Sequence, residues 1–429
     1  MKKTLCCIIL VWAVASLHAA DAPRHLTLQQ SEQVALAQHP RISVANLTAL
    51  AARESTRQAR SAFFPNIFGS ATAVGATDPN DTRLGAGALN NPIIYDREAE
   101  GITISQLITD FGRTWELTQS AKLRARSQEM NLEATKEQIL LAIDQAYFSS
   151  LAAQSVLEVA QQTVKTREPV LQEIQTMAQN KLRSDLDVSF ASVDLDQANI
   201  LVAKATNDLN ASFAILSSLL ADREPETFIL ASVPMPPNIT NDVTALIQEA
   251  LSLRPDLARL RFERDAAREF AKAENKLVYP TVSAIGTAGI IPTGASQLPW
   301  DYAAAGVNVN VPIFAGGLYK ARRREAEYQA EAANQTLRDE ENNIIRDVQI
   351  TKLNLEYAFQ RLGLTESLLR NANDALQLAQ ARFKAGLSSI VELSQAELNQ
   401  TSAQIAEADA RYDYQSQHSA LDYQLGRLH

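Results

Sequence analysis

The sequence predicts a mainly α-helical chain with a membrane β-barrel portion, built from one structural repeat that occurs twice. Three observations lead to this fold class. Long stretches are rich in Ala, Gln, Glu, Leu and Arg, which is typical of long helices and coiled coils, whereas aromatic residues make up only 6%. Landmarks recur along the chain at two constant offsets. Uncharged segments alternate apolar and polar residues over lengths that suit transmembrane strands.

The first 20 residues have the features of a secretory signal peptide. Lys2 and Lys3 precede a short apolar core, which is followed by small residues suited to cleavage. Removal of the segment lowers the formal net charge from −9 to −11, and so acidic an exported chain is a poor nucleic-acid binder. Both cysteines, Cys6 and Cys7, lie inside the signal. We therefore expect an exported chain without disulfides, thiolate metal sites or cysteine nucleophiles.

The repeat is visible as paired landmarks. The early prolines pair at an offset of 215 residues, Pro40 with Pro255 and Pro65 with Pro280. From "TDFGR" (109–113) and "FAGGL" (314–318) onward the offset is 205, and it pairs Asp187 with Glu392. We expect a signal peptide (1–20), a first repeat (21–221), a linker (222–245) and a second repeat (246–429).

Each repeat has the same expected order of elements. A first helix ends at an aromatic residue and a proline, a strand pair in a stretch almost free of helix formers follows, and two long helices complete the repeat. The expected first helices are 41–64 and 256–279, and the strands lie at about 65–110 and 280–315. The expected long helices are 113–181 and 318–385, followed by 186–221 and 390–426.

The long helices carry a seven-residue apolar period, as in Val348, Leu355 and Leu362, which indicates left-handed supercoiling against neighbouring helices. A run of roughly 65 helical residues reaches about 100 Å, which suits a duct or a strut better than a globular domain. Pro169 interrupts the first repeat alone, and we expect a kink there.

Segments of the expected strand pairs alternate apolar and polar residues, as strands with one apolar and one polar face do. In "AAGVNVNVPIF", Val307, Val309 and Val311 share one face, and in "EGITISQL", Ile102 and Ile104 do the same. One hairpin per repeat gives four strands, too few to close a barrel, and lipid does not tolerate open sheet edges. The edges must be buried in water-soluble packing, or strands must be pooled between copies; three copies would supply twelve strands.

Together these features resemble the TolC-like outer membrane efflux proteins over essentially all of residues 26–428. The resemblance rests on the duplicated order of "HP" and "RP", "FFP" and "VYP", "VPIFAGG", and "FKAGLSSIVEL". It implies a homotrimer whose 12-stranded β-barrel lies in the outer membrane and continues as an α-helical barrel across the periplasm. It also implies an exit duct for efflux or type I secretion, with a periplasmic adaptor, an inner-membrane efflux pump or ABC exporter, and outer membrane lipids as partners.

The resemblance places the two helical turns at the periplasmic tip, where the family contacts its adaptor. The corresponding residues are Leu182, Arg183 and Ser184 in the first turn and Gly386, Leu387 and Ser388 in the second. The first turn matches only partly, because Lys181 stands where the second has Gly386. The alternative is a plain helix break with an N-cap serine.

The resemblance also assigns acidic residues just past the tip to the tunnel entrance. Asp187 and Glu392 occupy these positions, whereas Gln395 stands where a further aspartate is expected. Three copies would gather six carboxylates, which attract cations, repel anions and make closure sensitive to pH. The alternative is a solvated carboxylate near a helix N-terminus, where it is favourable in any case.

Aromatic residues gather where the expected helices meet the expected strands. They suit an interfacial belt, or alternatively a hydrophobic plug between soluble layers. These residues are Phe63, Phe64, Phe111, Trp115, Tyr279, Phe314 and Tyr319. Nearby "YKARRRE" (319–325) is the one dense basic cluster, and it suits either phospholipid head groups or salt bridges to neighbouring helices.

No motif in the sequence indicates an enzyme, a metal site or a cofactor. "TDFGRT" (109–114) lacks the other parts of a kinase, and "GAGALN" (85–90) lacks the third glycine of a dinucleotide fingerprint. Four histidines outside the signal lack metal-ligand spacing: His25, His39, His418 and His429. The leading hypothesis is an outer membrane channel that projects into the periplasm; the alternative is a non-channel periplasmic coiled-coil scaffold.

Overall fold

The computed structural model describes residues 24–74, 97–222, 226–239, 242–293 and 299–428. The signal peptide, "GAGALN", His429 and most of both hairpin turns lie outside these residues. The chain forms two compact units, and each takes segments from both sequence repeats. Unit 1 comprises Met1–Ala37, Ala142–Pro236 and Gln360–Ser416, and unit 2 comprises Gln38–Leu141, Pro237–Phe359 and Gln417–His429.

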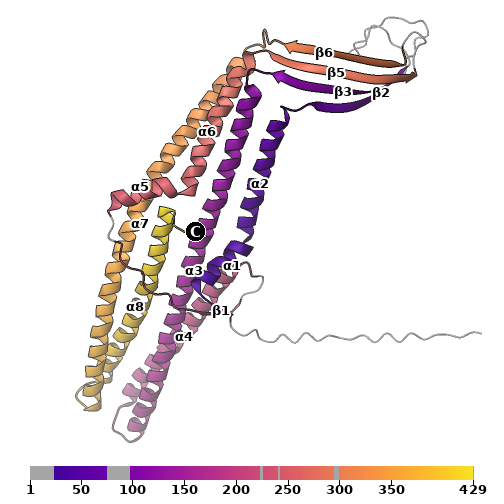
Figure 1. Cartoon of the computed structure of the whole chain (residues 1–429). Coiled ribbons are helices and arrows are strands. Elements are labelled where there is room, and N and C mark those ends of the chain that lie inside the picture. The colour runs from indigo at the N-terminus through magenta and orange to yellow at the C-terminus, as the bar shows by residue number, and fades with distance from the viewer. Residues whose placement is uncertain (1–23, 75–96, 223–225, 240–241, 294–298, 429) are drawn as a thin grey trace, which may run out of the picture. The chain divides into compact units, whose positions relative to one another are not determined.

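Unit 2 contains one four-stranded antiparallel sheet (Figure 1). Its strands are β2 (Asn66–Val74), β3 (Arg97–Thr109), β5 (Thr281–Thr293) and β6 (Asp301–Asn310), in the order β2-β3-β5-β6. The expected hairpin of each repeat is confirmed, and the two hairpins join through β3 and β5. Val311, expected to continue the last strand, lies just past its end.

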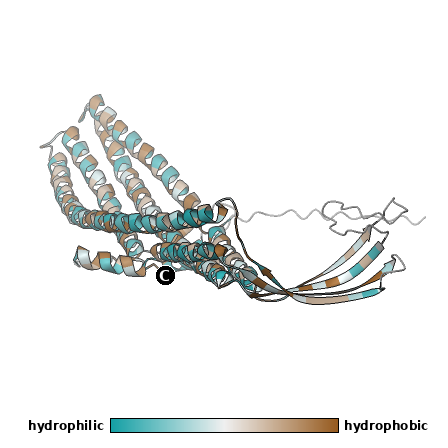
Figure 2. Ribbon diagram, turned by 90° about the horizontal axis from the view of Figure 1, so that it is seen from above, coloured by the Kyte–Doolittle hydropathy of each residue, from teal (hydrophilic) through white to brown (hydrophobic). Residues whose placement is uncertain are grey.

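The sheet leaves apolar side chains exposed on both faces. Successive residues of a strand point to opposite faces, and Ile67 and Phe68 are both exposed. Ile102 and Ile104 alternate with Thr103, whose hydroxyl lies 3.3 Å from that of Thr287 on β5. Brown, hydrophobic residues accordingly recur along the strands in Figure 2. The expected alternation is therefore present at Ile102–Ile104 of β3, whereas β2 carries apolar residues on both of its faces.

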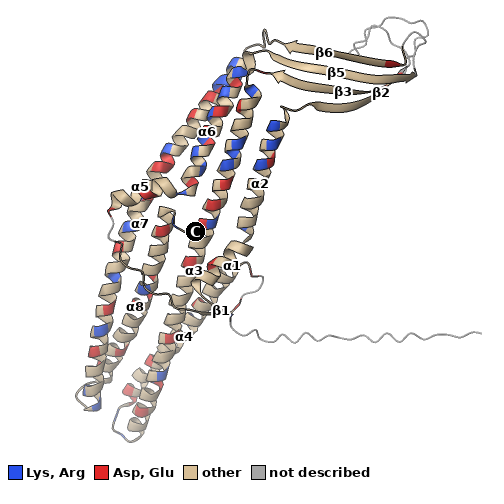
Figure 3. Ribbon diagram, in the orientation of Figure 1, with Lys and Arg blue, Asp and Glu red and all other residues tan. Residues whose placement is uncertain are grey.

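Charged side chains are confined to one end of this sheet (Figure 3). Glu98 and Glu100 lie at the start of β3, and Asp301 begins β6. The register places Glu100 and Asp301 level with the same residue, Ile290 of β5. The opposite end, where the strands meet the helices, carries the seven predicted aromatic residues, whereas Trp300 and Tyr302 lie at the charged end.

Prolines set the boundaries of the shorter helices. The helices α2 (Pro40–Ser61) and α6 (Pro255–Asn275) start at the expected prolines, because proline is favourable at the first helical position. Both end a few residues earlier than expected, and α6 continues into a 3₁₀ turn (Lys276–Val278). Two 11-residue helices were not expected: α1 (Leu28–Gln38) and α5 (Val243–Leu253), which begins within the expected linker.

Four long helices follow the predicted boundaries within two residues. The helices α3 (Arg113–Gln179) and α7 (Leu318–Lys384) have 67 residues each, and α4 (Asp185–Leu219) and α8 (Ile390–Leu425) follow them. The helix α3 continues through Pro169, and the kink expected there stays a prediction. Among helices of the described residues, none combines the length and apolarity that a membrane-spanning helix requires.

Unit 1 contains a two-stranded element that sequence analysis missed. The strand β1 (Arg24–Leu26) pairs in parallel with β4 (Phe228–Leu230), which lies inside the expected linker. The buried Tyr147 hydroxyl on α3 lies 3.0 Å from the carbonyl oxygen of Leu26 and 2.7 Å from that of Ala231. The linker is therefore attached to the long helix rather than free of it.

Candidate functional site at the helical turns

The turns α3–α4 and α7–α8 have the same backbone hydrogen bonds, although their sequences differ. Each long helix ends in a Schellman motif, in which two backbone amides cap carbonyl groups of the last turn. In the first turn, Leu182 N donates to Met177 O at 2.8 Å and Lys181 N to Ala178 O at 2.9 Å. In the second, Leu387 N donates to Arg382 O at 2.8 Å and Gly386 N to Phe383 O at 3.0 Å.

The capping residue of both motifs is left-handed. Gly386 has φ 73° and Lys181 has φ 61°. Glycine adopts this conformation freely, whereas an L-residue with a side chain loses about 1–2 kcal/mol in it. The partial match of the first turn to the family pattern therefore does not change the backbone of the turn.

The serine that caps the following helix differs from the expected one in the second turn. Ser184 Oγ accepts from Asp187 N at 3.2 Å, and the Asp187 carboxylate accepts from Ser184 N at 3.1 Å, a complete capping box. The equivalent cap is Ser389, whose hydroxyl accepts from Glu392 N at 3.4 Å. The hydroxyl of Ser388 is buried and has no hydrogen-bond partner in the described residues.

Both turns present one leucine to solvent. Leu182 is 73% exposed and Leu387 71% exposed, and the two leucines occupy equivalent positions in the Schellman motifs. Between the turns, the Arg183 guanidinium carbon lies 4.5 Å from the centre of the Phe383 ring, a cation–π contact. The arrangement joins the two turns into one surface with a matched apolar side chain on each.

The expected entrance residues all have partners within the chain. Asp187 belongs to the capping box, and Glu392 forms an ion pair with Arg382 at 2.9 Å. Gln395 donates to Asn399 at 2.9 Å. Asp187 and Glu392 lie at matching places in the first turns of α4 and α8. Both carboxylates thus act locally at helix N-termini, and any role at a trimer axis is additional.

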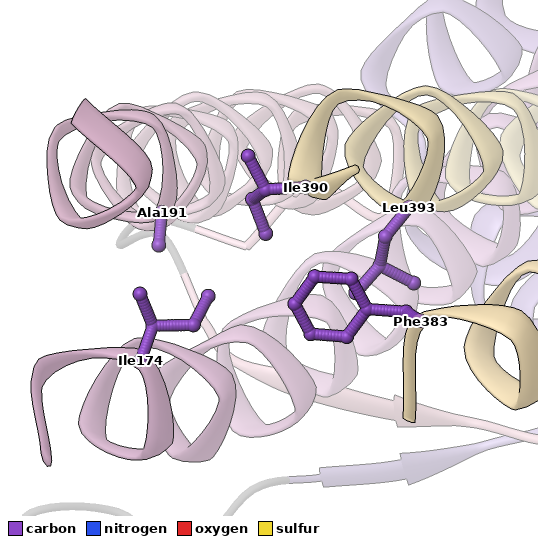
Figure 4. Close-up of a cluster of buried hydrophobic side chains, with 5 residues drawn as sticks. All are labelled: Ile174, Ala191, Phe383, Ile390 and Leu393. Carbon is purple, nitrogen blue, oxygen red and sulfur yellow. The ribbon is translucent and has the colours of Figure 1, made fainter. Parts of the chain in front are cut away.

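One apolar cluster supports both turns. It combines side chains of all four long helices, as Figure 4 shows: Ile174, Ala191, Phe383, Ile390 and Leu393. Since the cluster includes residues of both repeats, the two turns share a core at the end of unit 1.

A buried polar group adjoins this cluster, and sequence analysis missed it. Arg167 is only 6% exposed and donates from Nη1 to Asp194 O at 2.7 Å. Its Nε lies 3.9 Å from a carboxylate oxygen of Glu397, and the Ser394 hydroxyl donates to the Asp194 carboxylate. Burial raises the pKa of Glu397, and Arg167 partly offsets this.

A sequence signal for Arg167 does exist. Ala160, Arg167 and Ile174 are seven residues apart and all three are buried, so that the arginine occupies a core position of the heptad pattern. A charged residue in such a series indicates a buried polar contact, because a core position otherwise favours an apolar side chain.

The predicted aromatic residues lie in unit 2, where the strands meet the helices. Six are exposed, with Phe314 the most at 88%, and Tyr319 is half-buried. The rings of Phe111 and Tyr279 stack with their centres 5.5 Å apart, which joins the two repeats at this level. Their placement in an interfacial belt stays a prediction.

The basic cluster at the start of α7 is partly engaged in salt bridges. Arg322 pairs with the almost fully buried Glu274 at 2.8 Å, and Arg323 pairs with Glu327 at 3.4 Å. Lys320 and Arg324 are exposed. The salt-bridge alternative therefore accounts for two of the four cations.

The histidines have ordinary structural contacts. His39 Nδ1 accepts from Arg41 N at 3.1 Å, and burial lowers the pKa of His39. His418 Nδ1 lies 3.1 Å from the Asp422 carboxylate, and His25 lies in β1. Over the described ranges, no group of three or more His, Cys, Asp or Glu side chains is arranged to hold a metal ion.

Long helical hairpins and a four-stranded antiparallel sheet with exposed apolar residues define the class of fold. The family model described as "Outer membrane efflux protein" matches residues 32–222 and 246–427, so the chain belongs to the outer membrane efflux protein family. The match covers both sequence repeats. The protein is therefore an outer membrane exit channel of the efflux and secretion type, and nothing in the comparisons supports the scaffold alternative.

Curated relatives and solved structures agree with this assignment. The outer membrane protein TolC of Escherichia coli is 23% identical over 419 residues, covering 94% of this chain and 82% of its own. The alkaline protease secretion protein AprF of Pseudomonas aeruginosa is 22% identical, covering 78% and 70%. The fold matches the crystal structure of VceC from Vibrio cholerae with a TM-score of 0.78 at 18% identity, covering 93% and 96% of the chains.

Proposed function

We propose that three copies of this chain form the channel, with their twelve strands closed into one barrel in the outer membrane. The observation that carries the proposal is the sheet, which has exposed apolar side chains on both faces. Within the described residues, β2 and β6 each pair on one side only. Unpaired backbone groups are not tolerated in lipid, so the edge strands of neighbouring copies must pair with each other.

Exposed apolar residues on the helices support the same assembly. On α4 they recur at heptad spacing, and similar residues start α8: Leu186, Phe190, Val193 and Ile200, with Val391 and Leu398. Such a stripe is buried when another helix packs against it as in a coiled coil. Neighbouring copies would supply that helix, and the assembled helices would form the periplasmic tunnel.

The two turns form the proposed docking surface for a periplasmic adaptor, through which an inner-membrane efflux pump or ABC exporter would feed the channel. Leu182 and Leu387 supply exposed apolar contacts, which association with another protein would bury. Arg183, Ser184 and Gly386 stabilise the turns behind these leucines, and Ser388 is the remaining proposed contact residue. No chemical step by the protein itself is part of this proposal.

Asp187, Glu392 and, less strongly, Gln395 are the proposed residues of the tunnel entrance. Their first-turn positions repeat in both hairpins, so a trimer would carry six carboxylates near its tip. Rings of carboxylates favour cations over anions.

The proposal is tested with the full chain purified from outer membranes. We expect a trimer by analytical ultracentrifugation and cation-selective conductance in planar bilayers. The double variant Asp187→Asn/Glu392→Gln should keep the trimer but lose most of the cation selectivity. A monomer without conductance would refute the channel assembly, and unchanged selectivity in the double variant would refute the assigned entrance.

A further inference from the structure

The first two turns of α7 carry a basic patch, defined here as Lys320, Arg322, Arg323 and Arg324. The first turn of α7 has no acidic residue. The repeat does not require the patch, because the equivalent residues of α3 are uncharged: Trp115, Leu117, Thr118 and Gln119. The patch is therefore a feature of the second repeat alone.

The electrostatic setting of the patch is unfavourable in the isolated chain. Cations at a helix N-terminus face the positive end of the helix dipole, where anions are preferred. Arg322 and Arg323 have carboxylate partners. Lys320 and Arg324 are exposed, and no ion pair or hydrogen bond of their side chains is formed with the described residues. An external anion would relieve this arrangement.

The position of the patch indicates which class of anion it binds. Phe314 and Tyr319 immediately precede it, and the apolar strand β6 ends at Asn310. The run from Lys320 to Arg324 rises about 6 Å along the helix axis. Figure 3 shows further blue ribbon segments, which are Lys or Arg, at the helix ends that adjoin the sheet. The exposed Arg60 lies in the last turn of α2. Apolar strand, aromatic residues and cations thus follow one another as hydrocarbon, interface and head groups do in a bilayer.

We propose that Lys320 and Arg324 bind the phosphate groups of anionic phospholipids in the leaflet that faces the periplasm. The inference rests on the proposed function, because it requires the sheet to lie in the membrane. Arg322 and Arg323 hold the helix end through Glu274 and Glu327, and the two unpaired cations meet the lipid. Attraction to anionic lipid of this kind falls with ionic strength.

Trp115 provides a local probe for the test. It is equivalent to Lys320 in the repeat and is exposed, whereas Trp300, the other tryptophan of the described residues, precedes β6 at the opposite end of the sheet. In a Trp300→Phe background, quenching of Trp115 by brominated phosphatidylglycerol and brominated phosphatidylcholine gives the ratio of the two lipid affinities beside the patch.

We expect phosphatidylglycerol to be preferred, with the preference reduced about fivefold for each cation removed in Lys320→Gln/Arg324→Gln. The matched control is Arg338→Gln/Arg370→Gln, which removes two exposed cations of the same helix and should leave the preference unchanged. Equal quenching by both lipids in the parent protein, or an equal loss in the control, would overturn the inference. If neither lipid quenched Trp115, the membrane position of the sheet would be refuted instead. Conductance of the same samples tests the channel separately.

Discussion

At three junctions the two repeats have the same backbone conformation, although different residues occupy the equivalent positions. In each case the first repeat has a side chain where the second has glycine, and all six residues are left-handed. The pairs are Phe111 and Gly316 (φ 58° and 59°), Lys181 and Gly386 (61° and 73°), and Ala221 and Gly426 (62° and 71°).

These pairs separate what the fold requires from what each repeat adds. At Lys181/Gly386 and Ala221/Gly426 the left-handed conformation recurs because the capping hydrogen bonds at the helix C-termini require it, whichever residue is present. At Phe111/Gly316 it recurs just before the starts of α3 and α7. The first repeat thereby loses about 1–2 kcal/mol at each junction. At Phe111 the ring stacks on Tyr279 and offsets part of this loss, whereas Lys181 is exposed and has no comparable contact in the described residues.

The largest expected effect tests a feature that only one repeat supplies. The equivalent of Arg167 is the buried Ala372, so the arginine contact with Glu397 has no counterpart in the second repeat. Arg167→Ala leaves Glu397 buried without its cation and should destabilise the protein by about 3–5 kcal/mol. Thermal unfolding followed by circular dichroism measures this.

Two variants control that experiment. Lys165→Ala, an exposed neighbour on the same helix, should change stability by less than about 0.5 kcal/mol. Arg167→Ala combined with Glu397→Gln should recover part of the loss, because the unpaired charge is gone. Equal stability of Arg167→Ala and the parent protein would contradict a role for the ion pair.

The second expected effect is a pH dependence that also belongs to one repeat. Glu137 on α3 is buried, and its burial is the largest cause that raises its pKa to about 7. Repulsion from Asp256 and, to a smaller extent, from Glu133 also raises the pKa, whereas Arg254 lowers it. The folded chain therefore keeps a proton that the unfolded chain loses near pH 4.5, so this contribution to stability is lost as the pH rises from about 4.5 to about 7.

The Glu137→Gln variant should remove this dependence. The equivalent residue of the second repeat is Asn342, which does not titrate. At pH 8 the variant should be more stable than the parent by up to about 3 kcal/mol, and near pH 4 the two should be similar. Unfolding midpoints across this pH range provide the comparison, and parallel curves for the two proteins would show that Glu137 does not control it.

The smallest expected effect exchanges the residues of the two turns. Lys181→Gly should stabilise the protein by about 1 kcal/mol and Gly386→Lys should destabilise it by a similar amount, since both positions are left-handed. No other atom lies within 4 Å of a Cβ added at Gly386, so backbone strain alone should set the result. Chemical denaturation resolves such differences, and effects of the same sign would contradict equivalence of the turns.

The sequence was sufficient for the long elements because each carried several independent signals. The heptad period, the punctuating prolines and glycines, and the duplicated landmarks together located the ends of α3, α4, α7 and α8 within two residues. The strands were recognised from their alternation, although Val311 lies beyond β6.

The missed features are short or depend on tertiary contacts. Three residues each in β1 and β4 are too few to show a period, and the 11 residues of α1 show a helical period only weakly. Ser388 stays a predicted residue of the second tip, and the neighbouring Ser389 is the cap of α8 that sequence analysis did not single out. The Arg167 contacts required knowledge of which helices face one another.

The charged residues at one end of the sheet affect how slowly an inserted barrel would leave the membrane. In the proposed assembly, Glu98, Glu100 and Asp301 lie on the outer side of the hydrocarbon layer in every copy. Withdrawing an inserted barrel would carry nine carboxylates through lipid, where ionised side chains are strongly unfavourable. Insertion crosses the same barrier once during biogenesis. In the proposed assembly the charged rim would therefore act as a kinetic anchor that slows departure of the barrel from the membrane.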